Sequence, residues 1–298
     1  MDIMLDESFE NRSGIIWMDN KFIPWQDAKL HVLTHSLHYG SAVFEGSRAY
    51  NGTVFKLKEH NERLHKSAEL LGFKIPYSVD VLNKATTELL KANHLKDAYI
   101  RPVAWYSGES LSLGAPASRV HVVIAAWVWK SYFQQNGAAK KGLKLMWSPW
   151  VRPSPTMAPV AAKASGLYIT GTLSKHQAEQ SGFDDALMLD YRGYIAECTG
   201  ANVFMVKGDE LHTPLADCFL NGITRQTVIK LAKDLGIPVH ERHIKPEELK
   251  EIDEMFVTGT AAEIVPVSQI SDIHLKTGSI TEKLMHAYMQ LVRQPCLE

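Results

Sequence analysis

Lys163 is the residue whose surroundings in the sequence most suggest covalent chemistry. It lies in the segment 161–168 among alanine, serine and glycine, and no other charged residue occurs between Pro153 and Lys175. Small neighbours predict a closely packed, partly dry wall, where burial disfavours the ammonium form of an amine. A neutral lysine can form a Schiff base with the carbonyl of a substrate or of pyridoxal phosphate. The alternative is a surface lysine whose stem lies along apolar neighbours at a helix start.

Two short motifs in the second half of the chain could bind a phosphate through backbone amides. Gly222-Ile223-Thr224 precedes an amphipathic segment, so these amides would lie at the positive end of a helix dipole. Gly259-Thr260-Ala261-Ala262 follows a predicted strand and offers a second cradle. Taken alone, each motif also fits an ordinary helix start with a threonine cap. The absence of a Gly-x-Gly-x-x-Gly or Walker-type loop argues against a dinucleotide or a nucleoside triphosphate.

Three further side chains could contact the same ligand. Glu197 follows the apolar Ile195 and Ala196, where a carboxylate is costly unless it is paired, and a protonated pyridine nitrogen would be a suitable partner. Tyr168 follows Lys163 by five residues and offers a phenol. Arg63 lies on a charged helical face, and the alternative to a ligand contact is an arginine exposed to solvent. For Glu197, the alternative is an ordinary glutamate at the end of a hairpin.

Other kinds of active site find less support. His31, His35 and His38 have a spacing seen in metal sites, but Glu45 is the only other ligand type nearby. We therefore expect capping and packing roles for these histidines, and no metal. No nucleophile elbow with a Ser/His/Asp set and no glycosidase-like pair of carboxylates is visible.

The elements that must position these residues begin with a largely antiparallel first half. Turns are predicted at Asp19-Asn20 and Asn51-Gly52, each between two short strands. Apolar periodicity predicts a helix over 58–71 and a second one that begins after Ser78 or Asp80. Strands are expected over 98–105 and 119–129. Pro102 within the first of these predicts a sheet edge or a bulge.

The second half alternates short strands and helices. Helices are predicted over 174–180, 222–236 and 282–292, with strands over 185–190, 202–207, 210–213 and 254–258. The composition changes over 131–142, which we interpret as a linker between domains 1–130 and 143–298. Many short antiparallel strands with interspersed helices favour an α+β fold over a doubly wound sheet.

Composition limits the class of protein. The 298 residues are 45% apolar and 22% charged, and the net charge of −1 argues against nucleic-acid or anionic-membrane partners. Three widely spaced cysteines provide no disulfide framework, which favours a reducing cytoplasm. The acidic N-terminus does not resemble a secretory signal. The longest apolar run, 122–128, is too short to span a membrane.

Eight motifs occur in the order found in class IV aminotransferases, and the sequence resembles the bacterial branched-chain-amino-acid aminotransferases of that family. The similarity covers about 15–292. The motifs are 35–40, 43–46, the helix with Arg63, 99–102, 163–168, 197–202, 222–225 and 259–263. The order of all eight makes the similarity specific for fold and cofactor. Two departures are Ser47, where the family has an apolar residue, and the loop 110–116, so the exact substrate preference stays open.

The resemblance implies the two-domain α+β fold of pyridoxal-phosphate enzymes called fold type IV, as in D-amino-acid aminotransferase. A smaller N-terminal α/β domain (1–130) would be joined by a loop (131–142) to a larger, barrel-like C-terminal domain (143–298) that anchors the cofactor. The resemblance also implies a homodimer in which a partner subunit completes the site, and it leaves a hexamer open.

The resemblance assigns roles to individual residues. Lys163 would hold pyridoxal 5'-phosphate covalently, Glu197 would pair with the pyridine nitrogen, and Tyr168 would face the phenolic oxygen. The phosphate would be held by Arg63, Ile223, Thr224 and Thr260. Tyr99, with the turn at Thr260-Ala261, would bind the substrate α-carboxylate, and Arg101 would bind the side-chain carboxylate of glutamate. The apolar pocket would be lined by Phe44, Trp129 and Tyr132, with Tyr39 from the other subunit.

The activity implied is reversible transfer of the amino group of L-leucine, L-isoleucine or L-valine to 2-oxoglutarate, with ping-pong kinetics. Within the same fold, the alternatives are a D-amino-acid or (R)-amine transaminase and an aminodeoxychorismate lyase. The run 99–102 and the aromatic pocket favour the first activity. A binding protein without catalysis is a further alternative, which intact Lys163 and Glu197 argue against.

Overall fold

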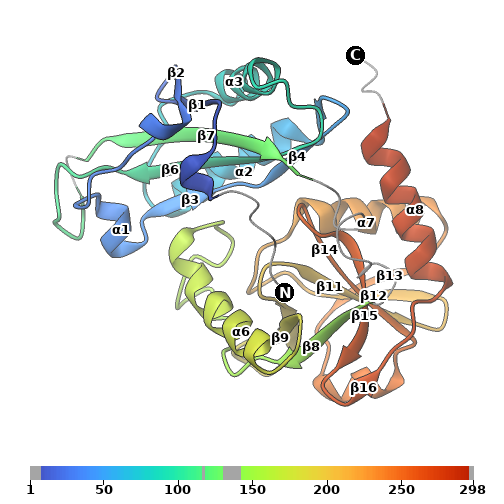
Figure 1. The fold of residues 1–298 in the computed structure, drawn as a ribbon. Helices are drawn as coiled ribbons and strands as arrows, with labels where there is room; N and C mark the ends of the chain where they lie inside the picture. The colour runs from blue at the N-terminus through green and yellow to red at the C-terminus, as the bar shows by residue number, and fades with distance from the viewer. Residues whose placement is uncertain (1–7, 116–117, 130–141, 295–298) are drawn as a thin grey trace. The chain divides into compact units, whose positions relative to one another are not determined.

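A computed structural model describes residues 8–115, 118–129 and 142–294. These residues form two compact units, each with its own sheet (Figure 1). Unit 1 contains the described residues up to Trp129 together with Ala162–Gly166. Unit 2 contains the rest of the described chain. No helix within the described ranges is both long and apolar enough to cross a lipid bilayer.

Unit 1 is built on a seven-stranded sheet with the order β2-β1-β7-β6-β4-β5, and β3 also pairs with β6. Both predicted turns form, because Asp19, Asn20 and Asn51 adopt the positive φ angles that two-residue hairpins require. The strands are β1 (Ile15–Met18), β2 (Lys21–Pro24), β3 (Ala42–Phe44), β4 (Ser47–Tyr50), β5 (Thr53–Val54), β6 (Ala98–Tyr106) and β7 (Val120–Val128).

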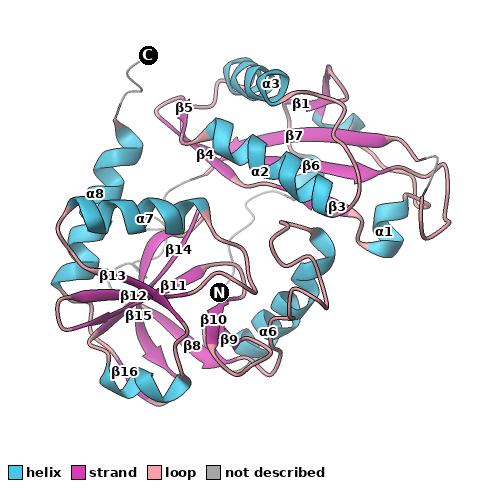
Figure 2. Cartoon of the chain, turned by 180° about the vertical axis from the view of Figure 1, so that it is seen from behind, coloured by secondary structure: helices cyan, strands magenta, loops and turns pink. Residues whose placement is uncertain are grey.

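Two helices, α2 (Leu57–Leu70) and α3 (Val79–Ala92), pack against this sheet (Figure 2). Both match the predicted segments, and the Ser78 hydroxyl caps α3 by accepting from the Val81 amide. The core between helices and sheet is apolar and fully buried. It includes Leu64, Leu82, Leu89, Ile100 and Ile124. Unit 1 also contains α1 (His35–Tyr39) and the 3₁₀ turns Phe9–Asn11 and Trp25–Asp27.

Pro102 does not lie at an edge, because β6 pairs with β7 on one side and with β3 and β4 on the other. Strands β3 and β4 pair with β6 in the same register, since Phe44 is opposite Val103 and Ser47 is opposite Ile100. The ladder is interrupted only at Glu45 and Gly46. There the Glu45 amide donates to the Pro102 carbonyl at 2.9 Å, but proline has no N–H to return the bond. Pro102 thus divides the strand beside β6 into the two shorter strands β3 and β4.

Unit 2 is a curled, nine-stranded sheet with the order β10-β9-β8-β15-β14-β11-β12-β13, to which β16 is added beside β15. Three pairs are parallel (β8–β9, β8–β15 and β12–β13), and the rest are antiparallel. The strands are β8 (Leu143–Trp147), β9 (Asp185–Leu189), β10 (Ile195–Cys198), β11 (Asn202–Lys207), β12 (Glu210–Pro214), β13 (Val239–Arg242), β14 (Glu254–Gly259), β15 (Glu263–Ile270) and β16 (Ile273–His274).

Three helices pack on the unit 2 sheet, and an apolar cluster that includes Leu145, Val257 and Val267 fills its core. The helices are α6 (Ile169–Gln180), α7 (Ile223–Asp234) and α8 (Ser279–Arg293), with 3₁₀ turns at Ser165–Tyr168 and Pro246–Glu251. Helix α6 begins five residues before the predicted start. Gly171 explains this, because a Cβ there would lie 2.9 Å from the Thr199 carbonyl oxygen, so close packing outweighs the low helix propensity of glycine.

The segment Ala162–Gly166 belongs to unit 1, which differs from the predicted division at 131–142. Its backbone extends the edge of β3, with Ala164 bridged to Val43 and the Phe44 amide donating to the Lys163 carbonyl at 3.0 Å. Such long-range backbone pairing cannot be read from local composition. Apart from Gly142, the predicted interdomain loop lies outside the described residues.

Candidate functional site

Lys163 is held by its backbone from two elements of unit 1. Its carbonyl accepts from Phe44 on β3, and its amide donates to the Ser67 hydroxyl on α2 at 3.0 Å. The side-chain nitrogen Nζ lies 4.9 Å from the centroid of the Phe44 ring. The side chain is half-buried, with Ala162 and Ala164 buried on either side. The lysine is thus fixed at the main chain and presents its amine beside an aromatic face.

The small residues around Lys163 allow a close approach of two backbones. Gly40 has φ +66°, and a Cβ there would lie 3.0 Å from Cα of Gly166. A larger residue at Gly40 would push the lysine segment away from the loop after α1, whereas a Cβ at Gly166 would make an ordinary contact at 3.5 Å. The close packing expected from the sequence is present at Gly40, Ala162 and Ala164, while Ala161, Ser165 and Gly166 are exposed.

A cation and several aromatic rings surround the same face of β6. The Arg101 guanidinium carbon lies 4.7 Å from the Phe44 ring centroid, and Nη2 donates to the Tyr99 hydroxyl at 3.1 Å. The Tyr99 ring packs against Trp127 and Trp129, at 5.2 and 5.3 Å between centroids. Within the described residues, Arg101 Nε is buried and makes no hydrogen bond. A carboxylate bound here would meet a cation and a phenol beside apolar surface.

Arg63 is oriented by a fully buried carboxylate. Its Nε and Nη2 donate to the two Glu45 oxygens at 2.6 and 2.9 Å, and His60 Nδ1 lies 2.7 Å from Glu45 Oε2. Burial alone would raise the pKa of Glu45, but the Arg63 charge and the hydrogen bonds from His60 and Arg63 outweigh it. The pKa therefore lies well below its usual value. Glu45 remains ionised at neutral pH and fixes the arginine fork.

Glu197 at the end of β10 is a buried carboxylate with a paired charge. Its Oε1 lies 2.9 Å from Arg152 Nε, and its Oε2 accepts from Asn202 Nδ2 at 3.2 Å. Arg152 is fixed in turn, because its Nη2 donates to the carbonyls of Cys198 and Thr199. The pairing offsets the cost of burying the carboxylate, as the sequence led us to expect.

The phosphate cradle predicted at 222–224 lies at the N-terminus of α7, the twelve-residue helix that Gly222 caps. The Gly222 amide donates to Asn202 Oδ1 at 3.1 Å, and no side chain caps the first turn. Ile223 and Thr224 are buried, and their amides belong to the helix start, where intrahelical acceptors are lacking. A Cβ at Gly222 would lie 2.3 Å from Asn202 Oδ1, so a larger residue would displace the Asn202 amide.

Other predicted residues occupy turns and loops. Thr260 and Ala261 form the tight turn between β14 and β15, where Gly259 pairs with Glu263. Tyr168 ends a 3₁₀ turn directly before α6. Tyr39 on α1 is half-exposed, and its hydroxyl donates to the Leu111 carbonyl at 3.3 Å. Tyr132 lies outside the described residues.

Comparison with known proteins identifies the family. The family model for amino-transferase class IV matches residues 42–270. The chain belongs to the class IV aminotransferase family. A probable branched-chain-amino-acid aminotransferase of Rickettsia felis is 46% identical to this class IV aminotransferase, and the match covers 94% of this chain and 96% of that protein. The branched-chain-amino-acid aminotransferase of Pseudomonas aeruginosa is 42% identical, with coverage of 96% and 95%.

A solved structure confirms the expected fold. The branched-chain amino acid aminotransferase of T.th., crystallised with N-(5'-phosphopyridoxyl)-L-glutamate, superposes with a TM-score of 0.90 at 38% identity. The match covers 95% of this chain and 96% of that chain. The predicted two-domain α+β class IV fold with a barrel-like second sheet is therefore correct.

The predicted site residues are divided between the two units. Unit 1 brings the Lys163 amine, Phe44, Tyr99, Arg101 and Trp129 into one set of contacts. Unit 2 links Glu197 to the Gly222 cradle through a single side chain, Asn202, and places Thr260 and Ala261 at the end of β14.

Sequence analysis missed the residues that hold these groups. Glu45 and Asn202 lie inside the motifs 43–46 and 197–202, so their positions in these motifs could have marked them as part of the site. His60 and Ser67 share α2 with Arg63, and helical spacing places them near it. Arg152 carried no signal, because its pairing with Glu197 depends on the folding of unit 2.

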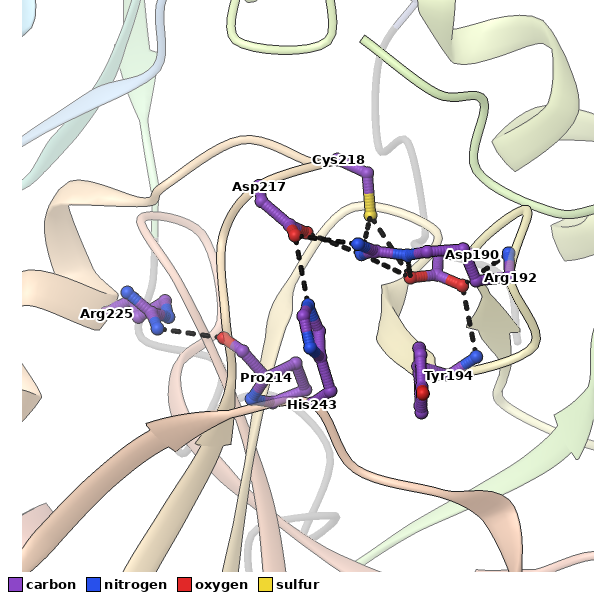
Figure 3. Close-up of polar contacts among 8 residues, drawn as sticks. All are labelled: Asp190, Arg192, Tyr194, Pro214, Asp217, Cys218, Arg225 and His243. Atoms are coloured by element: carbon purple, nitrogen blue, oxygen red, sulfur yellow. Dashed lines mark hydrogen bonds and ion pairs between the residues drawn. The ribbon is translucent and has the colours of Figure 1, made fainter.

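A second polar cluster in this class IV aminotransferase, only partly buried, resembles a metal site but contains an arginine where the ion would lie. Asp190, Asp217 and Cys218 converge, and the Arg192 guanidinium lies between the two carboxylates at 2.7 and 2.8 Å (Figure 3). Burial and then the two carboxylates raise the pKa of Cys218 to about 12, so the thiol stays protonated. His243 also contacts Asp217, at 3.0 Å. The cluster fastens the loop after β12, which leads into α7.

Proposed function

We propose that this protein is a branched-chain-amino-acid aminotransferase that exchanges amino groups between L-leucine, L-isoleucine or L-valine and 2-oxoglutarate. The observation that carries this proposal is the placement of Arg101. It is a half-buried cation with an unused donor, set among aromatic rings and joined through Phe44 to the Lys163 amine. The activities named for the relatives support the same function.

The cofactor of this class IV aminotransferase is pyridoxal 5'-phosphate, and the residues present fit it. A buried carboxylate with fixed partners suits a protonated pyridine nitrogen, and the glycine-capped start of α7 suits a phosphate. In our proposal, Lys163 holds the cofactor, Glu197 contacts its ring nitrogen and Tyr168 its phenolic oxygen. Arg63, Ile223, Thr224 and Thr260 bind its phosphate. When bound, the cofactor supplies an electron sink for negative charge at the substrate Cα.

The protein side chains then supply proton transfer and orientation. The Lys163 amine would remove the proton from the substrate Cα as a general base and would then donate it, as a general acid, to the cofactor rather than back to Cα. Glu197 keeps the proton on the ring nitrogen, and Arg152 and Asn202 hold the carboxylate in place for this task. Because amino acid and 2-oxo acid use the same residues in turn, the kinetics are ping-pong.

One pocket must accept both leucine-like side chains and glutamate. The aromatic face of Phe44 and Trp129 provides apolar surface for the first kind of substrate, and our proposal assigns Tyr132 to the same pocket. Burying a carboxylate there would be costly without a counter-charge, and the Arg101 fork provides one. Tyr99, with the turn at Thr260-Ala261, binds the α-carboxylate common to all substrates.

We also propose that the enzyme is a homodimer, in which Tyr39 of one subunit completes the pocket of the other. Two segments of unit 1 that contact each other, around α1 and over 107–115, expose large apolar side chains. These are Leu30, Val32, Leu33, Leu37, Tyr39, Leu111 and Leu113. We refer to them as the α1 patch. Clusters of exposed apolar residues are typical of protein interfaces. A cytoplasmic location is consistent with the buried thiols Cys198 and Cys218, neither of which forms a disulfide.

Substrate turnover tests the proposal. Purified protein supplied with pyridoxal phosphate and 2-oxoglutarate should convert L-leucine to its 2-oxo acid, while D-alanine should give no more than background. The visible absorption of the cofactor should change on adding L-leucine alone. Turnover of D-alanine without turnover of L-leucine would assign the enzyme to the D-amino-acid branch of the fold instead.

A further inference from the structure

Asn202 connects two parts of unit 2 that the proposed function assigns to opposite ends of the cofactor. Its Nδ2 donates to Glu197 Oε2 at 3.2 Å and to the Leu220 carbonyl at 3.0 Å. Its Oδ1 accepts from the Gly222 amide at 3.1 Å. The side chain is buried at the start of β11. One side-chain amide therefore contacts both the carboxylate and the residue that begins the phosphate cradle.

Three of the four hydrogen bonds that this amide can make are formed. Both N–H donors of Asn202 and one lone pair of its oxygen have partners. Aspartate has the same shape but no donor at neutral pH, and alanine has neither function. The contact is also tight, since Gly222 has no room for a Cβ beside Asn202 Oδ1.

The loop held by Asn202 has a second, independent anchor. Arg225 on α7 donates from Nη2 to the Pro214 carbonyl at 2.9 Å and from Nη1 to Asn221 Oδ1 at 2.9 Å. This anchor does not involve Glu197. Asn221 therefore offers a matched comparison: the same residue type in the same loop, without contact to the carboxylate.

We propose that Asn202 is a positioning residue that couples the orientation of Glu197 to the placement of the phosphate-binding amides of α7. The inference rests on the proposed function, which assigns these two groups to the ring nitrogen and the phosphate of one cofactor. A displacement of Asn202 would release Glu197 on one side and Gly222 on the other. Both ends of the cofactor would then be bound less well through the loss of one residue.

Cofactor titrations of the apoenzyme separate the two ends. Pyridoxal lacks the phosphate, so its dissociation constant reports binding at the ring end. The dissociation constant of pyridoxal divided by that of pyridoxal phosphate reports how much the phosphate end contributes to binding. Because hydrogen bonds to charged groups are at stake, we expect Asn202→Ala to weaken pyridoxal binding about 10-fold and pyridoxal phosphate binding about 100-fold. The ratio should therefore decrease about 10-fold. Asn221→Ala should leave the pyridoxal constant unchanged.

A second variant tests the hydrogen bonds themselves. Asn202→Asp places a carboxylate opposite Glu197 Oε2 and the Leu220 carbonyl, while Arg152 contacts the other Glu197 oxygen. Its protonated form regains one donor and keeps the acceptor for Gly222. At each pH the affinity of the variant for pyridoxal phosphate is compared with that of wild type. As the pH is lowered from about 8 to about 6, the affinity of Asn202→Asp should approach the wild-type value, whereas the affinity of Asn202→Ala should stay equally far below it. A role in stability alone would not produce this pH dependence.

The outcomes distinguish this inference from the proposed function. If the wild-type apoenzyme does not bind pyridoxal phosphate, the proposed function fails. If it binds, but Asn202→Ala leaves either the pyridoxal constant or the ratio unchanged, the coupling is refuted and the proposed function stands. Thermal melting of each apoenzyme shows whether it is folded. Should Asn202→Ala not fold, the pH recovery of Asn202→Asp decides, and no recovery refutes the inference.

Discussion

At the scale of single residues, the proposed site depends most on side chains that carry charge in partly buried places. Arg101, Arg63 and Glu197 are each oriented by neighbours before any ligand arrives. Tyr99 contacts Arg101, while Glu45 holds Arg63 and Arg152 holds Glu197. Such preorganisation reduces the cost of ordering these groups when a charged ligand binds.

Arg101→Ala should separate the two kinds of substrate. We expect kcat/KM for glutamate to decrease by about 10- to 100-fold, because the variant loses charged hydrogen bonds worth about 1.5–3 kcal/mol, while leucine is affected far less. Steady-state kinetics with both amino donors measures the difference. Arg119→Ala, which removes an exposed arginine of the same unit, is the control. Equal losses for glutamate and leucine would show that Arg101 does not contact the side-chain carboxylate.

Glu45→Gln should change the pH dependence of stability. The folded-state pKa of Glu45 lies below its usual value of 4.5, so its contribution is present above about pH 4.5 and is lost as pH falls towards the lower pKa. We expect the variant to be about 3–5 kcal/mol less stable at pH 7, because Arg63 and His60 lose a buried partner. It should also lose less of its stability than wild type between pH 5 and pH 3.

Urea unfolding of the apoenzyme at pH 7, 5, 4 and 3 measures this effect. Glu69→Gln, which removes an exposed carboxylate from the same helix, should behave like wild type. Parallel pH profiles for wild type and Glu45→Gln would contradict the assignment of a depressed pKa to Glu45.

Residue types point to candidate site residues where the chemistry itself limits the choice. A lysine among small residues, a carboxylate after an apolar strand and a glycine before a helix could each be recognised from local sequence. Arg152 and Trp127 could not, because their contacts with Glu197 and Tyr99 join residues more than 25 positions apart. No periodicity or turn signal marks such pairs.

At the scale of elements, the reactive segment depends on two neighbours that it meets only after folding. Strand β3 holds the Lys163 carbonyl, and α2 holds its amide through Ser67. The same helix carries Arg63 and His60. Helix α2 therefore links the lysine to the proposed phosphate-binding arginine.

Ser67→Ala should loosen the lysine segment without removing any group that contacts a substrate. The Lys163 amide would lose its acceptor, which costs about 1–3 kcal/mol when the amide is buried. We expect faster hydrogen exchange in a peptide covering 162–166 and a lower kcat. Thr87→Ala removes an exposed hydroxyl that bonds only within its own helix, and it should leave both unchanged. Unchanged exchange in Ser67→Ala would rule out this anchoring.

Hairpins and amphipathic helices were predicted well because their signals are local. The turns at Asp19-Asn20 and Asn51-Gly52 and the cap at Ser78 follow from conformations that these residues favour. Two elements departed from prediction for tertiary reasons. Pro102 lies in an interior strand because the neighbouring strand divides around it, and α6 begins early because Gly171 packs against Thr199.

At the scale of the whole molecule, the α1 patch is the feature that bears on assembly. Leu37→Asp should shift the protein from dimer towards monomer, because a charge in an apolar interface must be desolvated. Leu70→Asp, which places the same charge at an exposed leucine on α2, should remain dimeric. Sedimentation velocity over a range of concentrations gives the masses. A wild-type protein that stays monomeric at high concentration would refute the proposed homodimer.

The proposed function requires a covalent bond between the Lys163 amine and pyridoxal phosphate. Borohydride reduction of the loaded wild-type enzyme, followed by proteolysis and mass spectrometry, locates that bond. We expect one phosphopyridoxyl label, on the peptide that contains Lys163, and none on Lys163→Ala. A label on a different lysine, with Lys163 unmodified, would refute the assignment of Lys163 as the residue that holds the cofactor.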